Sequence, residues 1–141
     1  MTAPRDLPLP ETEARAREVL AGPLPARLGI VLDRIEAGEV IVTLPFDPGN
    51  RTLGDVVHGG AIATLADVTG VATALCGLRS LPDAGGTATL TVSYLAPAIA
   101  CDLTARGILL RAGRTQCVAR VGVTDPAGRL VAEAQVTVAF V

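Results

Sequence analysis

The stretch from His58 to Leu78 constrains the fold more than any other part of the chain. Its residues are almost all apolar or small, and Asp67 near the middle is the one carboxylate among them. Alanine and leucine are frequent and Gly77 is a fitting stop, so we predict a helix here. Apolar residues would lie on all sides of that helix, which must therefore span a membrane or be enclosed by other structure.

An enclosing sheet explains this helix better than a membrane does. The stretch is long enough to cross a bilayer. Asp67, however, would cost roughly 2.5–3.5 kcal/mol at the centre of a membrane span. Threonines and many alanines also make the stretch less apolar than a typical span. We therefore expect no membrane association.

The beginning and the middle of this helix carry candidate catalytic groups. Gly59 and Gly60 allow a tight turn into the helix, and the first amides of a helix lie at its positive end without an intrahelical partner, ready to bind an oxyanion. Asp67 is a carboxylate in apolar surroundings, which is rare unless the group is stabilised or used.

The spacing of these groups predicts a dimer. Asp67 lies eight residues after Gly59, which is ~12 Å along a helix axis at 1.5 Å per residue. An aspartate side chain cannot span that distance. If both groups act on one substrate, they must come from two subunits whose central helices run antiparallel.

The composition indicates a single domain and excludes several classes of partner. The chain has 141 residues, a net charge of −2 and one histidine, so no basic field points to nucleic acid and a zinc site is not expected. The N-terminus has no apolar signal region, so we expect a cytoplasmic protein. The cysteines lack C-x-x-C spacing and are expected to be reduced structural thiols: Cys76, Cys101 and Cys117.

The rest of the chain predicts an antiparallel sheet. Along residues 87–95 hydroxyl side chains alternate with Ala, Leu, Val and Tyr, the pattern of a half-buried antiparallel strand. The fold class is therefore α+β, with about six antiparallel strands wrapped around one long helix. In order we expect an arm (1–10), a short helix (11–20), strands (30–35, 39–44), a loop (45–55), the long helix, a loop (80–86) and strands (87–95, 102–111, 115–124, 130–140).

The motif VHGGAIATLAD, residues 57–67, resembles the signature of the PaaI-like (phenylacetate-pathway) group of hotdog-fold thioesterases. YLAPA at residues 94–98 and Gly113-Arg114 follow in the order of that family. The resemblance implies a hotdog domain over residues 25–141, preceded by an arm and short helix over residues 1–24. It also implies a dimer that joins two sheets edge to edge, often a dimer of dimers, and hydrolysis of acyl-CoA thioesters without metal or cofactor.

The resemblance also assigns catalytic roles. Asp67 falls on the family's nucleophile or general base, Gly59 on its oxyanion amide, and His58 on the histidine near the carbonyl and the leaving thiolate. Thr87 falls on a hydroxyl residue early in the next strand. Many members have an asparagine six residues before the histidine, where this chain has threonine, so Asn50 is the candidate for that role.

Other predicted contacts and functions have plain alternatives. Gly60, Arg114 and Arg111 are candidates for substrate and CoA binding, the arginines through phosphates. A solvated hairpin tip is the plain alternative for both arginines, and it is slightly favoured for Arg111. His58 alternatively only orients the turn. The competing functions are a hotdog-fold hydratase or dehydratase acting on acyl thioesters, and a non-catalytic acyl-CoA-binding protein.

Overall fold

A six-stranded antiparallel sheet packs against one long helix. The computed structural model describes residues 7–141, so the first six residues of the predicted arm lie outside the described part. The strand order is β1-β2-β4-β5-β6-β3, with every pair antiparallel. The elements are α1 (Pro10–Leu20), α2 (Pro23–Leu28), β1 (Val31–Glu36), β2 (Glu39–Leu44), the 3₁₀ turn η1 (Pro48–Asn50), α3 (Gly59–Cys76), β3 (Gly85–Tyr94), β4 (Leu103–Ala112), β5 (Gln116–Thr124) and β6 (Leu130–Phe140).

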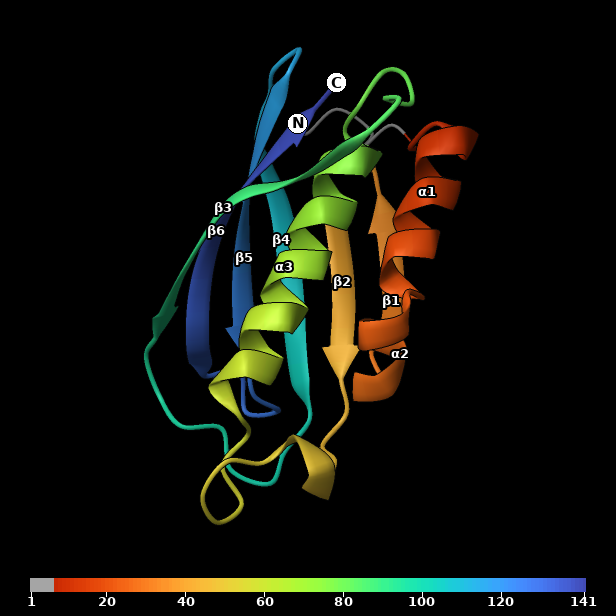
Figure 1. Ribbon diagram of the computed structural model, residues 1–141. Helices are drawn as coiled ribbons and strands as arrows, with labels where there is room; N and C mark the ends of the chain where they lie inside the picture. Colours follow the sequence, from red (N-terminus) through yellow and green to blue (C-terminus); the bar gives the residue numbers. More distant parts are fainter. Residues whose placement is uncertain (1–6) are drawn as a thin grey trace.

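The predicted long helix is α3, and the α+β class is confirmed. The sheet covers one side of α3 and α1 packs on another (Figure 1). By length and composition α3 would also qualify as a membrane span, but 67% of it is buried inside the fold, as in the core helix of a globular domain. The sheet and α1 together thus account for the apolar residues around the helix.

Small residues let α3 approach the sheet closely. A Cβ added at Gly70 would lie 2.6 Å from the Cβ of Val136 on β6. Gly77 ends α3 as predicted, although its φ of −96° is open to any residue. A Cβ there would lie 2.2 Å from the Cδ2 of Leu109 on β4, so a larger residue would require the Leu109 side chain to move.

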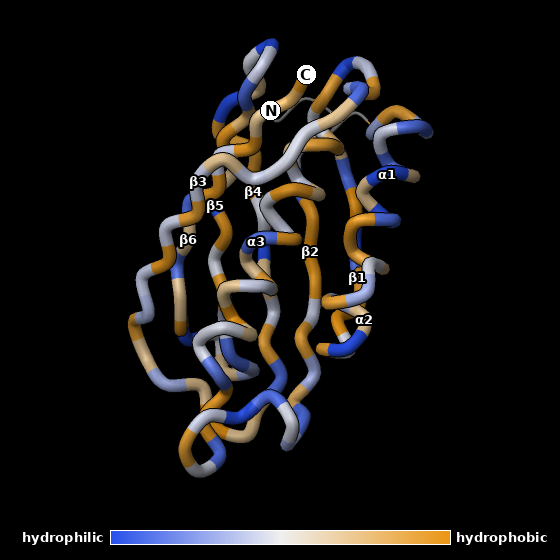
Figure 2. Tube along the Cα trace, in the orientation of Figure 1, coloured by the Kyte–Doolittle hydropathy of each residue, from blue (hydrophilic) through white to orange (hydrophobic). Residues whose placement is uncertain are grey.

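The core consists of aliphatic side chains that alternate along the strands. Alternate residues of the inner strands point at α3 and are buried, and Figure 2 shows hydrophobic segments along these strands and hydrophilic ones on α1 and in the turns. Fully buried side chains include Val40, Val42, Leu44, Leu65, Leu103, Val121, Val123, Val136 and Val138.

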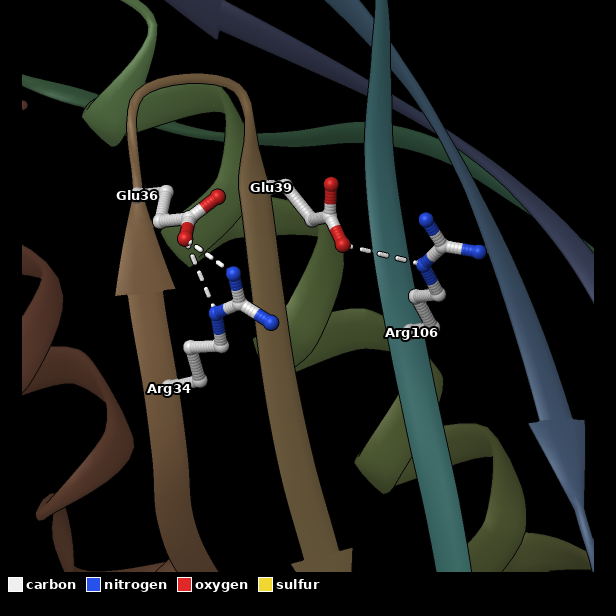
Figure 3. A network of polar contacts seen from close by, with 4 residues as sticks. All are labelled: Arg34, Glu36, Glu39 and Arg106. Carbon is white, nitrogen blue, oxygen red and sulfur yellow. Dashed lines mark hydrogen bonds and ion pairs between the residues drawn. The ribbon is translucent and has the colours of Figure 1, made fainter. Parts of the chain in front are cut away.

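Charged residues occupy the face of the sheet that points away from α3. Glu39 on β2 is 7% exposed, and the Nε of Arg106 on β4 donates to its Oε1 at 3.0 Å (Figure 3). On β1 the Nε of Arg34 donates to Glu36 Oε1 at 2.9 Å. A buried carboxylate is tolerated where a cation and a hydrogen bond compensate it. Arg106 on the neighbouring strand supplies both to Glu39, so this network has a structural role in the sheet.

Two short helices precede the sheet, and only the first was predicted. α1 buries Thr12, Ala16 and Leu20, and it packs against α3. The sequence Gly22-Pro23 reads as the end of α1, but Pro23 is also the first residue of α2, a position that favours proline. The division of the chain at residue 25 stays a prediction.

The antiparallel strand predicted over residues 87–95 is confirmed as β3, but its predicted half-burial is wrong for the single chain. Leu90 is 37% exposed and Tyr94 53% exposed, and only Val92 is partly buried. β3 is an edge strand, with β6 on one side and no other strand of the described chain on the other. A register shift between Thr87 and Thr89 also interrupts the alternation that the sequence suggests.

A buried hydroxyl on α3 provides a test of the packing. Thr69 is fully buried and its Oγ1 has no hydrogen-bond partner in the described part of the chain, whereas Thr73 Oγ1 donates to the Thr69 carbonyl at 2.7 Å. Removal of an unsatisfied hydroxyl is favourable, and removal of a satisfied one costs roughly 0.5–1.5 kcal/mol.

We therefore predict that Thr69→Val raises the free energy of unfolding by roughly 1 kcal/mol and that Thr73→Val lowers it by a similar amount. Urea unfolding of the two variants and the wild type measures both changes. Equal losses in the two variants would contradict the assignment of Thr69 as the unsatisfied group.

Candidate active site

His58 caps the N-terminus of α3. Its backbone is extended, and its Nδ1 accepts a hydrogen bond from the Gly60 amide at 2.7 Å. A neutral imidazole that accepts at Nδ1 carries its proton on Nε2. The side chain is exposed, so this Nε2–H is available to a ligand. His58 therefore orients the turn, as the plain alternative proposes, and still presents one donor.

The Gly59 amide is the free donor at this helix end. It has no acceptor among the described residues, because α3 begins at Gly59. Gly60 was predicted to bind substrate, but the His58 ring occupies its amide. A Cβ on Gly60 would also lie 3.0 Å from His58 Nδ1, so a glycine here lets the ring approach the helix.

Tyr94 at the end of β3 covers the same turn. Its hydroxyl donates to the Gly59 carbonyl oxygen at 2.6 Å. Tyr94 belongs to the YLAPA motif, which indicated no role for this residue. Gly59 and Tyr94 face a cavity of about 380 Å³ whose other walls are mostly apolar, formed by Thr52, Val56, Val57, Ile62, Leu95, Ala96, Pro97 and Ala98.

Asp67 and Thr87 meet, although they are twenty residues apart in the chain. Thr87 Oγ1 at the start of β3 donates to Asp67 Oδ1 at 2.6 Å. Asp67 is half-buried on α3 and Thr87 is exposed. The hydroxyl binds Oδ1 of the carboxylate and leaves Oδ2 available as an acceptor or nucleophile. The two predicted residues therefore belong to the same candidate site.

Asp67 and Gly59 do not meet within one chain. Both belong to α3, so the eight residues between them keep the two groups ~12 Å apart along the axis. The described chain thus holds two half-sites. The first is the N-terminal end of α3 with His58 and Gly59, here called the helix mouth, and the second is the pair of Asp67 and Thr87 at the middle of the helix.

Asn50 lies beside His58. Its carbonyl oxygen accepts from the His58 amide at 2.7 Å, and its side-chain Nδ2 donates to the Leu28 carbonyl at 3.3 Å. Asn50, His58 and Gly60 line a small cavity of about 240 Å³. The side chain of Asn50 thus connects the loop before α3 to the end of α2.

The two predicted arginines lie at the opposite end of α3 from Gly59. Arg114 lines a cavity of about 620 Å³ together with Arg79, Ser80, Thr115 and Phe140. Figure 1 shows the β4–β5 hairpin, which carries Arg111 and Arg114, near the C-terminal end of α3. Arg79 was not predicted as a binding residue, although its position just after the end of α3 could have indicated that it lies near Arg114.

The cysteines show no sign of nucleophilic chemistry. Burial raises the pKa of the Cys76 thiol to about 12, with a smaller contribution from Glu13. Burial also raises the pKa of Cys101 and Cys117. Among residues 7–141 no group of His, Cys, Asp and Glu could hold a metal ion.

A six-stranded antiparallel sheet packed against one long central helix is the architecture of the hotdog class of domains. A family model described as the Thioesterase superfamily matches residues 54–132. The chain belongs to this superfamily and has the hotdog fold of PaaI-like thioesterases.

Relatives support this assignment. A protein of Saccharolobus solfataricus, named as a candidate esterase, is 30% identical over 76% of this chain and 75% of its own length. The PaaI protein of the Escherichia coli phenylacetic acid degradation operon has a TM-score of 0.80 at 18% identity, covering 93% of this chain and 94% of that one. A hypothetical thioesterase of Streptococcus pneumoniae, crystallised with coenzyme A, has a TM-score of 0.70 at 28% identity, covering 79% and 85%.

The cap formed by His58 predicts a specific pattern of stabilities. His58→Ala removes the acceptor of the Gly60 amide and should lower the free energy of unfolding by roughly 1 kcal/mol. His58→Asn should change it by only a few tenths of a kcal/mol, because asparagine is among the best N-caps. Urea unfolding measures both. Equal losses in the two variants would show that His58 does not act as the cap.

Proposed function

We propose that the protein hydrolyses acyl-CoA thioesters to a free acid and CoA. The observation that carries the proposal is the pair of half-sites on α3: a free amide donor at Gly59 and a carboxylate, Asp67, fixed by Thr87. Membership of the Thioesterase superfamily and the relative that was crystallised with coenzyme A support this substrate class.

The complete site in this proposal contains two copies of the chain. The ~12 Å between Gly59 and Asp67 is bridged if a second α3 runs antiparallel, so that the partner's Gly59 lies beside Asp67. β3 supports this arrangement because it is an exposed edge strand that carries both Thr87 and Tyr94. Two copies of β3 paired about a two-fold axis near the middle of the strand would place Thr87 opposite the partner's Tyr94.

The chemistry follows from the two halves. The thioester carbonyl oxygen accepts from the partner's Gly59 amide, which stabilises the negative charge that develops on it. The Asp67 carboxylate supplies the attacking oxygen, either its own or that of a water from which it removes a proton. Attack by its own oxygen gives an acyl–Asp67 anhydride, which water then hydrolyses to release the acid and restore the carboxylate. The carbon–sulfur bond breaks, and the CoA thiolate leaves beside the Nε2–H of the partner's His58.

The cavity of about 620 Å³ that Arg79 and Arg114 line suits the nucleotide end of CoA. It lies beyond Cys76, which is nine residues and ~14 Å along α3 from Asp67. Arg114 and Arg79 can pair with phosphate groups there, because guanidinium groups bind phosphate oxygens in two-pronged contacts. The flexible pantetheine arm would then connect this cavity to the thioester. Arg111, which is exposed on the hairpin, would lie at the rim.

The direct test is thiol release from a panel of acyl-CoAs with short, medium, long and aromatic acyl groups. The wild type should turn over at least one class, and Asp67→Asn should lower kcat by roughly 10³-fold or more while it keeps the Thr87 hydrogen bond and the wild-type melting temperature. Binding without turnover would replace the proposal with a binding protein. Hydration of 2-enoyl thioesters without thiol release would replace it with a hydratase.

Gly59 allows a separate test of the oxyanion donor. Proline is favoured at the first position of a helix, and the extended backbone of His58 suits a following proline, so Gly59→Pro deletes the amide and preserves α3. We expect kcat to fall by roughly 10²–10³-fold.

The matched control is Gly59→Ala, which keeps the amide and adds a Cβ at an ordinary contact distance of 3.4 Å from the Tyr94 ring. This variant should keep kcat within roughly threefold of the wild type. Similar rates in the proline and alanine variants would contradict the role of the amide.

A further inference from the structure

Tyr94 contacts the mouth of α3 in two ways. Its hydroxyl donates to the Gly59 carbonyl oxygen at 2.6 Å, and its ring lies beside the bare Cα of Gly59. Tyr94 lies at the far end of β3 from Thr87 and is the only tyrosine in the chain. It is therefore the one phenol available to this site in each chain.

The peptide between Gly59 and Gly60 is held at both ends by side chains. Its carbonyl oxygen accepts from Tyr94, and its N–H donates to His58 Nδ1 at 2.7 Å. The three groups form a continuous chain of hydrogen bonds from the phenol to the imidazole through one peptide. Hydrogen bonds linked in this way polarise and strengthen one another.

The helix itself does not require the contact with Tyr94. The carbonyl of a residue in an α-helix accepts from the amide four residues later, so the Gly59 carbonyl is satisfied without a side-chain donor. The tyrosine hydroxyl is an additional donor from a different strand, on the one peptide that also binds the imidazole. Its position indicates control of the His58 ring rather than helix stability alone.

We infer that Tyr94 is a positioning residue, which acts through the Gly59–Gly60 peptide to hold His58 Nδ1 against the helix and to direct Nε2–H outward. The consequence for catalysis rests on the proposed thioesterase function, in which that Nε2–H faces the leaving thiolate. The geometry assigns this role to the hydroxyl, since the ring alone makes no polar contact with the peptide.

Tyr94→Phe removes the hydroxyl and keeps the ring. We expect kcat to fall about tenfold, which corresponds to about 1.4 kcal/mol, with KM within twofold of the wild type. The Gly60 amide proton should move upfield as its hydrogen bond weakens. The ¹⁵N shifts of the single histidine should move away from the pattern of a pure Nε2–H tautomer, without ambiguity of assignment.

The matched control is Thr64→Val. Thr64 Oγ1 donates to the Gly60 carbonyl at 2.9 Å, so this variant also loses a hydroxyl-to-carbonyl bond in the first turns of α3, but on the next peptide. It should leave kcat and the His58 signals unchanged.

Unchanged Gly60 and His58 resonances in Tyr94→Phe would overturn the inference whatever happens to kcat, because Tyr94 would then act elsewhere. Movement of the same resonances in Thr64→Val would overturn it too, since any loss near the helix mouth would have that effect. If the wild type cleaves no thioester, the proposed function fails, while the two NMR measurements still decide the role of Tyr94.

Discussion

The enclosure of α3 by the sheet is the constraint on which the site depends. The helix is wrapped by strands and by α1, and its glycines let the sheet approach within contact distance. A helix held in this way cannot bend to bring Gly59 and Asp67 together, because both lie on it and its hydrogen bonds fix a rise of 1.5 Å per residue. In the proposed reaction, in which both groups act on one carbonyl, they must therefore come from two chains.

β3 links the two half-sites to the edge of the sheet. Thr87 near its start holds Asp67, and Tyr94 at its end holds the Gly59 peptide. The strand is also the least covered part of the sheet, with both of its faces largely exposed. A change in β3 should for this reason affect both the reacting groups and any association between chains.

The sequence was sufficient to predict the central helix, the sheet and the separation of the half-sites. The helix followed from its composition, and the separation followed from counting residues between Gly59 and Asp67. The exposure of β3 could not be predicted, because an alternating pattern indicates two different faces without showing what covers them. α2 was missed because Gly22-Pro23 ends one helix and begins another.

The hydrogen bonds at the helix mouth were also beyond the sequence. Histidine is not among the preferred N-caps, so the sequence left a turn-orienting His58 as an alternative and did not identify the Gly60 amide as its partner. The contact between Tyr94 and Gly59 joins residues 35 positions apart, and it depends on the path of the whole sheet. Local patterns reveal which residues are available, whereas tertiary packing decides which of them meet.

A mixed dimer tests the two-chain site most directly. Asp67→Asn and Gly59→Pro chains would be co-expressed with different affinity tags, and dimers that carry both tags would be purified and assayed for thiol release. Each variant alone should be nearly inactive. A mixed dimer should have about half the wild-type activity, because one of its two sites combines an intact Asp67 with an intact Gly59. Mixed dimers as inactive as their parents would contradict the account.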